Sequence, residues 1–168
     1  MTSVILPRNQ CEPEYTEVLR KVGFTAYRDE ENDWIHEKIK FRPLLRILRL
    51  ADVYFPSTGQ GGYHPEKVNG IWNLVGSRMY KPIFRPLAFL EKQKIRRIKA
   101  QMCHAARKGL TFHLWWHPHN IGIRTEEHLA QLEDLFAYYQ TLKMQYGMES
   151  LNMREAAEKL EQEGRTNG

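Results

Sequence analysis

The stretch His113-Leu-Trp-Trp-His117-Pro-His119-Asn120 decides the fold that we predict for this chain. It follows Gly109, and Pro118 interrupts it near its end. Aromatic and β-branched residues between a glycine and a proline are typical of a β-strand. We therefore predict one buried strand over residues 110–117.

Side chains alternate between the two faces of a strand. In the predicted strand, the imidazoles of His113 and His117 therefore share one face with the indole of Trp115. The other face is apolar and suits packing against helices, and it consists of Phe112, Leu114 and Trp116. His117 lies at the carboxyl end of the strand, where parallel α/β folds place their reactive groups.

Hydrophobic periodicity and turn residues divide the rest of the chain into alternating strands and helices. Further strands are expected at residues 3–7, 24–28, 71–74 and 149–153, and helices at residues 13–22, 41–55, 88–107, 125–146 and 154–163. Such alternation predicts an α/β fold with a mostly parallel sheet. The strands are too few to close a barrel of about eight strands.

The expected organisation is a single domain over residues 1–163. Within it, residues 56–87 are expected to form a long irregular excursion, because glycines and prolines interrupt every period there. Residues 164–168 are expected to be a disordered tail. Gly59-Gln-Gly-Gly62 lacks the Lys-Ser/Thr pair and the following helix of a phosphate-binding loop, so we expect a plain loop.

Four of the predicted helices have a recognisable apolar stripe, and in the helix over 13–22 it consists of Tyr15, Val18, Leu19 and Val22. In the helix over 41–55 the arginines lie on the solvent side, and the stripe consists of Phe41, Leu44, Leu45, Leu48 and Ala51. In the helix over 88–107 it consists of Ile95, Ile98, Met102 and Ala105. In the helix over 125–146 it consists of Leu129, Leu132, Phe136, Tyr139 and Tyr146. Because Ile95 and Ile98 face the core, the basic run over 92–99 is expected to be a solvated face, and nucleic acid is not an expected partner.

The bulk composition is that of a small soluble protein. The chain has 168 residues, and 25 Lys and Arg against 20 Asp and Glu give a net charge of +5, which mildly favours an anionic partner or surface. Cys11 and Cys103 have no paired spacing and are expected to be reduced thiols. Residues 1–20 contain no apolar segment of a signal peptide, and no apolar run approaches the about 18 residues of a membrane span. We therefore expect a cytoplasmic protein without a membrane span.

The histidine-rich strand has three possible interpretations. It can be a core strand whose histidines are hydrogen-bonded. It can be a metal site formed by His113, His117 and His119, although zinc sites usually draw their ligands from several elements. It can also present one histidine as an acid–base group in a cleft, with Trp115 or Trp116 as a stacking wall.

Several motifs resemble one family of enzymes. Leu114-Trp-Trp-His117 resembles the closing Leu-x-x-His motif of the polysaccharide deacetylase (NodB-like) carbohydrate esterases, and residues 112–120 are similar to a bacterial branch of that family. Leu6-Pro-Arg-Asn-Gln10 resembles its arginine motif. Tyr27-Arg28 followed by Trp34 resembles the next segment, and Arg96-Arg-Ile-Lys99 also fits. The resemblance covers most of residues 3–160, but only as the C-terminal half of the family's domain.

The resemblance implies a partial (β/α) barrel of the NodB-like type and a hydrolase that removes N- or O-acetyl groups from an oligo- or polysaccharide. His117 matches the acid histidine, and Arg8 matches the arginine that orients a catalytic aspartate. Substrate contacts are implied for Leu114, Trp115, Trp116, His113 and Trp34.

The family also uses a divalent, zinc-like metal that is held by an aspartate and two histidines. Those ligands lie upstream of its arginine motif and are expected to be absent from this chain, since seven residues precede Arg8. The chain is therefore expected to be weakly active or inactive alone and to require a missing N-terminal half or self-association. The alternative is a non-catalytic carbohydrate-binding or interaction module, in which the stacking side chains are Trp115, Trp116, Trp72 and Tyr63.

Overall fold

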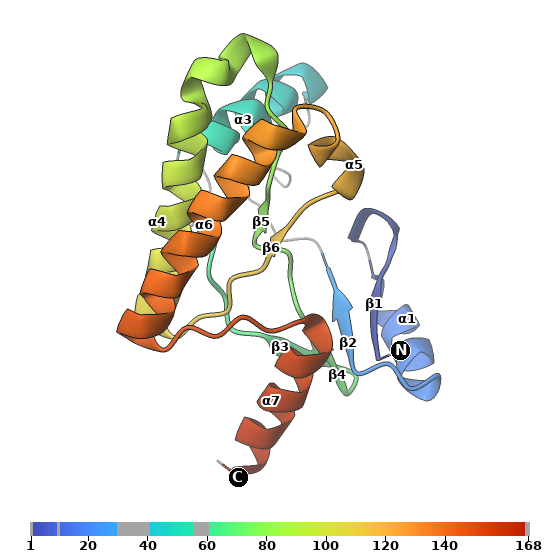
Figure 1. The fold of residues 1–168 in the computed structure, drawn as a ribbon. Coiled ribbons are helices and arrows are strands. Elements are labelled where there is room, and N and C mark those ends of the chain that lie inside the picture. Colours follow the sequence, from blue (N-terminus) through green and yellow to red (C-terminus); the bar gives the residue numbers. More distant parts are fainter. Residues whose placement is uncertain (1, 10, 30–40, 56–60, 167–168) are drawn as a thin grey trace. The chain divides into compact units, whose positions relative to one another are not determined.

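The computed structural model describes residues 2–9, 11–29, 41–55 and 61–166 (Figure 1). The chain divides into two compact units. Unit 1 comprises Met1–Glu31, His64–Gly76 and Glu149–Gly168, and unit 2 comprises Asn32–Tyr63 and Ser77–Met148. Each unit is thus assembled from separate stretches of sequence. The expectation of a single domain over residues 1–163 stays a prediction.

Unit 1 contains a four-stranded sheet with the strand order β1-β2-β4-β3. The strands are β1 (Ser3–Ile5), β2 (Ala26–Arg28), β3 (Glu66–Val68) and β4 (Ile71–Asn73). β1, β2 and β4 are parallel, whereas β3 is antiparallel to β4. Asn69 and Gly70 form the turn of that hairpin with φ of 49° and 86°, which is the left-handed region that glycine and asparagine tolerate best.

The helices of unit 1 are the short η1 (Pro7–Asn9), α1 (Pro13–Lys21) and α7 (Met153–Thr166). α7 packs on the sheet, since Ala157 joins Ala26 and Leu74 in a buried cluster. Asn152 begins α7 by accepting the N–H groups of Arg154 and Glu155, so the predicted strand over 149–153 is wrong. α7 continues to Thr166, so the predicted tail from residue 164 is also wrong over its described part.

Unit 2 is mainly helical. Its elements are α3 (Arg42–Tyr54), β5 (Arg78–Met79), η2 (Arg85–Leu90), α4 (Glu91–Lys108), β6 (Leu114–Trp115), α5 (Pro118–Ile121) and α6 (Thr125–Tyr146). β5 and β6 are parallel, and Thr111 forms an antiparallel bridge with Tyr63. The predicted strand over 110–117 is therefore present only as β6 and this bridge, and its residues 110–116 are half-buried rather than buried, whereas His117 is exposed.

The core of unit 2 lies between α4 and α6, which run side by side in Figure 1. Its buried side chains are Tyr80, Ile95, Ile98, Met102, Leu132, Leu135 and Leu142. The predicted stripe of α4 is confirmed, and Ala105 is also buried. The predicted stripe of α6 is partly wrong. Leu132 is buried, but Leu129 and Phe136 are exposed, and Leu135 and Leu142 take their place.

The predicted excursion over 56–87 is more regular than expected. Its described part carries β3, β4 and β5, of which only β4 matches a strand that the sequence predicts. Gly62 packs against Leu110 and Ala105, and Gly61 packs against Gln101 and Phe112. These two glycines thus serve close packing in unit 2.

The fold class is mixed α/β with a small, mostly parallel sheet, as predicted at this coarse level. The described strands do not close into a barrel. No described helix combines the length and the apolar character required to cross a membrane.

Candidate functional site

His117 is the exposed end of the histidine-rich stretch. It follows β6 by two residues and occupies the N-cap position of α5, with an extended backbone (φ −93°, ψ 123°). β6 runs parallel to β5, so His117 lies beyond the carboxyl end of a parallel strand, as the sequence predicts. A buried core position for this imidazole is excluded, since the residue is exposed.

The predicted alternation of side chains along this stretch is confirmed. Phe112, Leu114 and Trp116 pack against the core of unit 2. On the other face, the rings of Trp115 and His117 meet edge-to-face, with centroids 5.4 Å apart and planes at 89°. The backbone therefore holds His117 beside Trp115 because Leu114 and Trp116 fix the strand from the opposite side.

Two further histidines flank this pair. The rings of His117 and His119 are stacked, with centroids 5.2 Å apart and planes at 19°. The backbone N–H of His113 donates to Oγ of Ser77 at 3.0 Å, which ties this stretch to the residue before β5. The rings of Trp115, His117 and His119 thus form one cluster, and we call these residues, together with His113, the histidine turn.

The other predicted site residues lie elsewhere. Arg8 is in η1 of unit 1, and its side chain is outside the described part of the structure. Trp34 is outside the described residues altogether. The pairing of Arg8 with His117 therefore stays a prediction. In the same arginine motif, Asn9 has a left-handed backbone (φ 55°), and its Oδ1 accepts from Nε and Nη2 of Arg28 at 3.0 and 2.9 Å.

The described residues do not fit the family's metal site. No group of three or more His, Cys, Asp or Glu side chains among them is arranged to hold a metal ion. His113, His117 and His119 therefore do not form the three-ligand site that was one interpretation of the sequence. Zinc sites require three or four converging protein ligands, and the stacked pair of His117 and His119 supplies only two imidazoles.

A second polar site lies inside unit 2, where the sequence predicts solvated lysines. Lys94 is only 2% exposed, and its ammonium forms an ion pair with Oε2 of Glu91, which is also buried. Nζ of Lys94 donates to the carbonyl of Lys81 at 3.0 Å and lies 4.8 Å from the ring centroid of Tyr80. The basic run over 92–99 is therefore not a uniformly solvated face, and the prediction for Lys94 is wrong.

Hydrogen bonds extend from this ion pair into α6. Glu91 accepts from the hydroxyl of Tyr54 at 3.4 Å and from Nε2 of Gln131 at 3.2 Å. Oε1 of Gln131 accepts from the hydroxyl of Tyr80 at 2.7 Å, and that hydroxyl lies 2.8 Å from Nδ1 of His128. We call these residues, together with Lys94, the buried network.

The hydrogen bonds assign one tautomer to His128. The hydroxyl hydrogen of Tyr80 is used on Gln131, so Nδ1 of His128 carries a hydrogen and donates it to the Tyr80 oxygen. Nε2 of His128 accepts from the backbone N–H of Ile83 at 3.5 Å. The imidazole is therefore neutral when both of these contacts are made.

Burial shifts the pKa values of this network in a consistent direction. It lowers the pKa of His128, and the ammonium of Lys94 lowers it further. It also lowers the pKa of Lys94, although Glu91 acts in the opposite direction. Burial beside Glu91 raises the pKa of Tyr54 to about 12 and raises that of Tyr80 as well, so both phenols remain hydrogen-bond donors.

Another buried charge cluster joins α3 to α4 and β5. Asp52 accepts from Nη1 of Arg78 at 2.9 Å through one carboxylate oxygen and from Nη2 of Arg97 at 2.7 Å through the other. Oε1 of Gln101 accepts from Nε of Arg78 at 3.0 Å. Two guanidinium groups thus hold one carboxylate, which fixes α3 against its neighbours.

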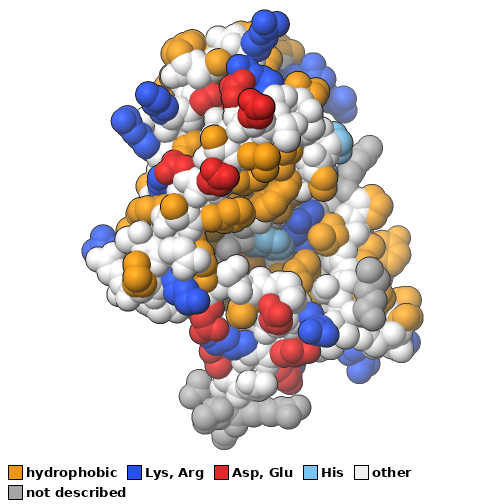
Figure 2. Space-filling view, in the orientation of Figure 1, with side chains coloured by type: hydrophobic (Ala, Val, Ile, Leu, Met, Phe, Trp, Pro, Cys, Tyr) orange, Lys and Arg blue, Asp and Glu red, His pale blue; other side chains and the backbone are white. Residues whose placement is uncertain are grey.

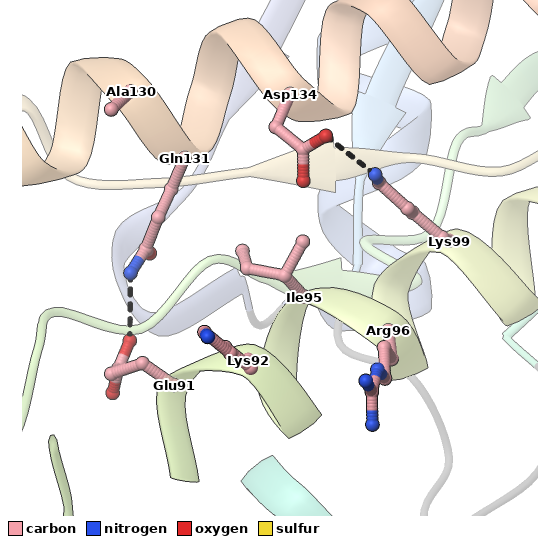
Figure 3. A pocket seen from close by; sticks show the side chains of 8 residues that line it. All are labelled: Glu91, Lys92, Ile95, Arg96, Lys99, Ala130, Gln131 and Asp134. Atoms are coloured by element: carbon pink, nitrogen blue, oxygen red, sulfur yellow. Dashed lines mark hydrogen bonds and ion pairs between the residues drawn. The ribbon is translucent and has the colours of Figure 1, made fainter. Parts of the chain in front are cut away.

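A groove of about 460 Å³ runs between α4 and α6. Figure 3 shows that its lining residues come from both helices: Glu91, Lys92, Ile95, Arg96, Lys99, Ala130, Gln131 and Asp134. Lys99 pairs with Asp134 at 2.6 Å across it. Because charges of both signs line the groove and Glu91 and Gln131 already bond each other, it has no single chemical preference.

The sequence contains a signal for the buried position of Lys94, which the predicted stripe of α4 does not include. Lys94, Ile98, Gln101 and Ala105 follow one another at steps of three and four residues, which places the polar side chains on the buried stripe of α4. Nothing comparable marks Tyr80 or His128.

Comparisons with known proteins give no further constraint. No protein-family model, no curated protein and no solved structure matches this chain.

Proposed function

We propose that this chain is the C-terminal part of a polysaccharide deacetylase-like hydrolase, in which His117 is the proton donor. The observation that carries the proposal is the exposed imidazole of His117 beyond the carboxyl end of β6, with Trp115 against its edge. The motif Leu114-Trp-Trp-His117 and its resemblance to the family supply the reaction class.

The chemistry assigned to His117 is general acid catalysis. When the bond between the acetyl carbon and the sugar nitrogen or oxygen breaks, the leaving atom takes a proton from the imidazolium, and the imidazole becomes neutral. Imidazole suits this step because it exchanges protons near neutral pH. The ring of Trp115 lies against His117 and is proposed to favour the orientation in which the imidazole offers its proton.

The neighbouring residues have supporting roles in this proposal. Leu114 and Trp116 contact the core, so they hold the backbone that carries His117. Trp115 and His113 lie on the face of the histidine turn and are proposed to contact the sugar. Arg8 is proposed to orient the catalytic aspartate of the complete enzyme.

The described residues do not gather the metal ligands of the family. We therefore assign to this chain only the proton-donating and sugar-contacting roles, within a partial barrel of the NodB-like type. The groups that activate the attacking water are proposed to come from a second polypeptide segment that completes the domain.

The test combines the full chain with a polypeptide that carries the Asp-Asp and His-x-x-x-His motifs of this family. Acetate release is measured on chitooligosaccharides and on acetylated xylooligosaccharides. We expect His117→Ala to lower the rate at least about 100-fold. His64→Ala is the matched control, because His64 is exposed and lies outside the histidine turn, and it should retain most of the rate. Full activity of His117→Ala in the combined enzyme would refute the assignment.

The alternative is a non-catalytic carbohydrate-binding module, and one observation favours it. Trp115 is half-buried, and its ring lies against the imidazole of His117, which is an arrangement suited to a sugar ring. Trp72, in contrast, packs in unit 1 beneath Lys67, and its Nε1 donates to Glu161. Titrating the chain with the same oligosaccharides, while following tryptophan fluorescence, distinguishes the two. Saturable binding that Trp115→Ala abolishes, without acetate release by the combined enzyme, supports the binding module.

A further inference from the structure

α3 exposes an unusual number of large apolar side chains. The exposed fractions lie between 38% and 67% for the following residues: Phe41, Leu44, Ile47, Leu50 and Phe55. Phe41 and Leu44 belong to the stripe that the sequence predicts to be buried, so this part of the prediction is wrong. Four of the exposed residues, Phe41, Leu44, Ile47 and Leu50, follow one another at steps of three residues. Each such step rotates the side-chain direction by about 60° around the helix axis, so the four cover about half of the circumference. We call this surface the α3 arc.

The buried side of α3 is fixed by other residues. Asp52 is held by Arg78 and Arg97, and Tyr54 donates to Glu91. Asp52 and Tyr54 are two residues apart, so they anchor the last turn of α3 from different sides. The side chains of the α3 arc are exposed and do not belong to the described core of unit 2, so the arc is available for a partner.

The charges on α3 identify the chemistry of that partner. Arg42, Arg46 and Arg49 are exposed, and the acidic residue of this helix, Asp52, is buried between two guanidinium groups. α3 thus presents apolar and cationic side chains to solvent with no exposed carboxylate of its own. Figure 2 views unit 2 from the face formed by α4 and α6, in front of α3, and there Lys and Arg side chains lie beside acidic ones.

We propose that α3 docks this protein onto an anionic lipid bilayer. A helix that is apolar on one side and arginine-rich beside it lies in the plane of a bilayer interface, where the apolar side chains enter the acyl boundary and the guanidinium groups meet lipid phosphates. The attachment is peripheral, because α3 spans 13 residues and lies along the surface. This role does not depend on the function proposed for the histidine turn.

A lipid surface explains the observations better than a protein surface does. The α3 arc covers about half of the helix circumference with aliphatic and aromatic side chains, and three exposed arginines accompany it. A bilayer accepts a convex apolar surface without matched side-chain pockets, whereas a protein partner requires shape complementarity.

The test is vesicle co-sedimentation of the full chain. One set of vesicles is phosphatidylcholine, and the other contains equal parts of phosphatidylcholine and phosphatidylglycerol. We expect binding to the anionic vesicles, at least about tenfold weaker binding to the neutral ones, and weakening by added salt. Equal binding to both vesicles, or no binding to either, would overturn the proposal.

Two variants of α3 separate the apolar and the charged contributions. Ile47→Glu places a carboxylate within the α3 arc and should lower the partition coefficient at least about tenfold. Arg46→Gln should lower it about fivefold on anionic vesicles and leave the weak binding to neutral vesicles unchanged.

Leu129→Glu is the matched control, because Leu129 is an exposed leucine on α6. It should bind vesicles as the unmodified chain does, and equal losses in Ile47→Glu and Leu129→Glu would contradict the role of α3. Far-UV circular dichroism and the urea midpoint confirm that both variants are folded. If the chain self-associates through Ile47 and does not sediment with anionic vesicles, the partner is a protein and the lipid proposal fails.

Discussion

The hydroxyl of Tyr80 lies 2.8 Å from Nδ1 of His128 and donates to Oε1 of Gln131 at 2.7 Å. Nε2 of the same imidazole accepts from the N–H of Ile83. Protonating Nε2 would turn this acceptor into a donor that faces another donor. The ammonium of Lys94 would also repel the new charge.

The first prediction is therefore a loss of stability in mild acid. Burial and Lys94 lower the pKa of His128 in the folded state below its ordinary value. In this pH range the unfolded chain therefore binds more protons than the folded chain does. The contribution of His128 to stability is present above about pH 6.5 and is lost as the pH falls below that value. We expect the free energy of unfolding in urea to fall by up to about 1.4 kcal/mol per pH unit in this range.

His128→Gln tests the source of that slope. Gln cannot be protonated, so the variant should be less stable near neutral pH but should lose less stability on acidification. His119→Gln is the control for the same substitution at an exposed position. An identical pH slope in His128→Gln and in the unmodified protein would show that another group is responsible.

The second prediction concerns the buried ion pair of Lys94 and Glu91. Lys94→Met removes the cation and leaves the carboxylate of Glu91 buried, so we expect a loss of about 3–5 kcal/mol in the free energy of unfolding. Lys99→Met is the matched control on the same helix. Its partner Asp134 is more than half exposed, so that change should cost less than about 1 kcal/mol.

A double variant separates pairing from packing. Combining Lys94→Met with Glu91→Leu removes both charges, so it should be more stable than Lys94→Met alone, because no unpaired charge remains buried. Urea unfolding of the three proteins gives the comparison. Equal stabilities of Lys94→Met and Lys99→Met would mean that the carboxylate of Glu91 reaches water in the folded protein.

The elements were predictable where one periodicity dominated. Around Leu114 and Trp116, apolar side chains recur at every second residue. In a strand these side chains share one face, so that face is the one that packs on the core. On α6, Leu129 and Phe136 lie two helical turns apart on one face, and Leu135 and Leu142 lie two turns apart on another. Sequence alone does not rank these two faces, because the choice depends on how α6 meets α4.

The buried charges were harder to predict for a different reason. A lysine such as Lys94 is placed in solvent by any rule based on average burial, because burying an ammonium is costly without a partner. Its partners come from a nearby turn of α4 and from the distant Tyr80, and only the folded arrangement joins them. The exposed position of His117, in contrast, agrees with one of the interpretations of the sequence, in which a histidine at the carboxyl end of a strand faces a cleft.

The third prediction tests the face that α6 buries. Leu135 is fully buried, whereas Leu129 is 49% exposed on the same helix. Leu135→Ala should lower the free energy of unfolding by about 2–5 kcal/mol, because it removes buried methyl groups and leaves a cavity. Leu129→Ala should change it by less than about 1 kcal/mol. Comparable losses in the two variants would mean that α6 is rotated about its axis from the position described.

The last prediction concerns Gly62, which the sequence placed in a plain loop. A Cβ atom added there would lie 2.9 Å from Cδ1 and 3.1 Å from Cβ of Leu110, and 3.3 Å from Cβ of Ala105. The leucine tip can turn away, but the two Cβ atoms are fixed to the backbone. Gly62→Ala should therefore lower the free energy of unfolding by about 1–3 kcal/mol.

Gly122→Ala is the matched control for this change. Gly122 has a helical backbone (φ −61°), and an added Cβ atom would make an ordinary contact of 3.6 Å with the carbonyl of His119. Restricting the unfolded chain should then stabilise the protein by up to about 1 kcal/mol. Urea unfolding of both variants gives changes of opposite sign if Gly62 is selected for close packing. A gain in stability for Gly62→Ala would mean that the segment before Tyr63 stands further from Leu110 and Ala105 than these contacts require.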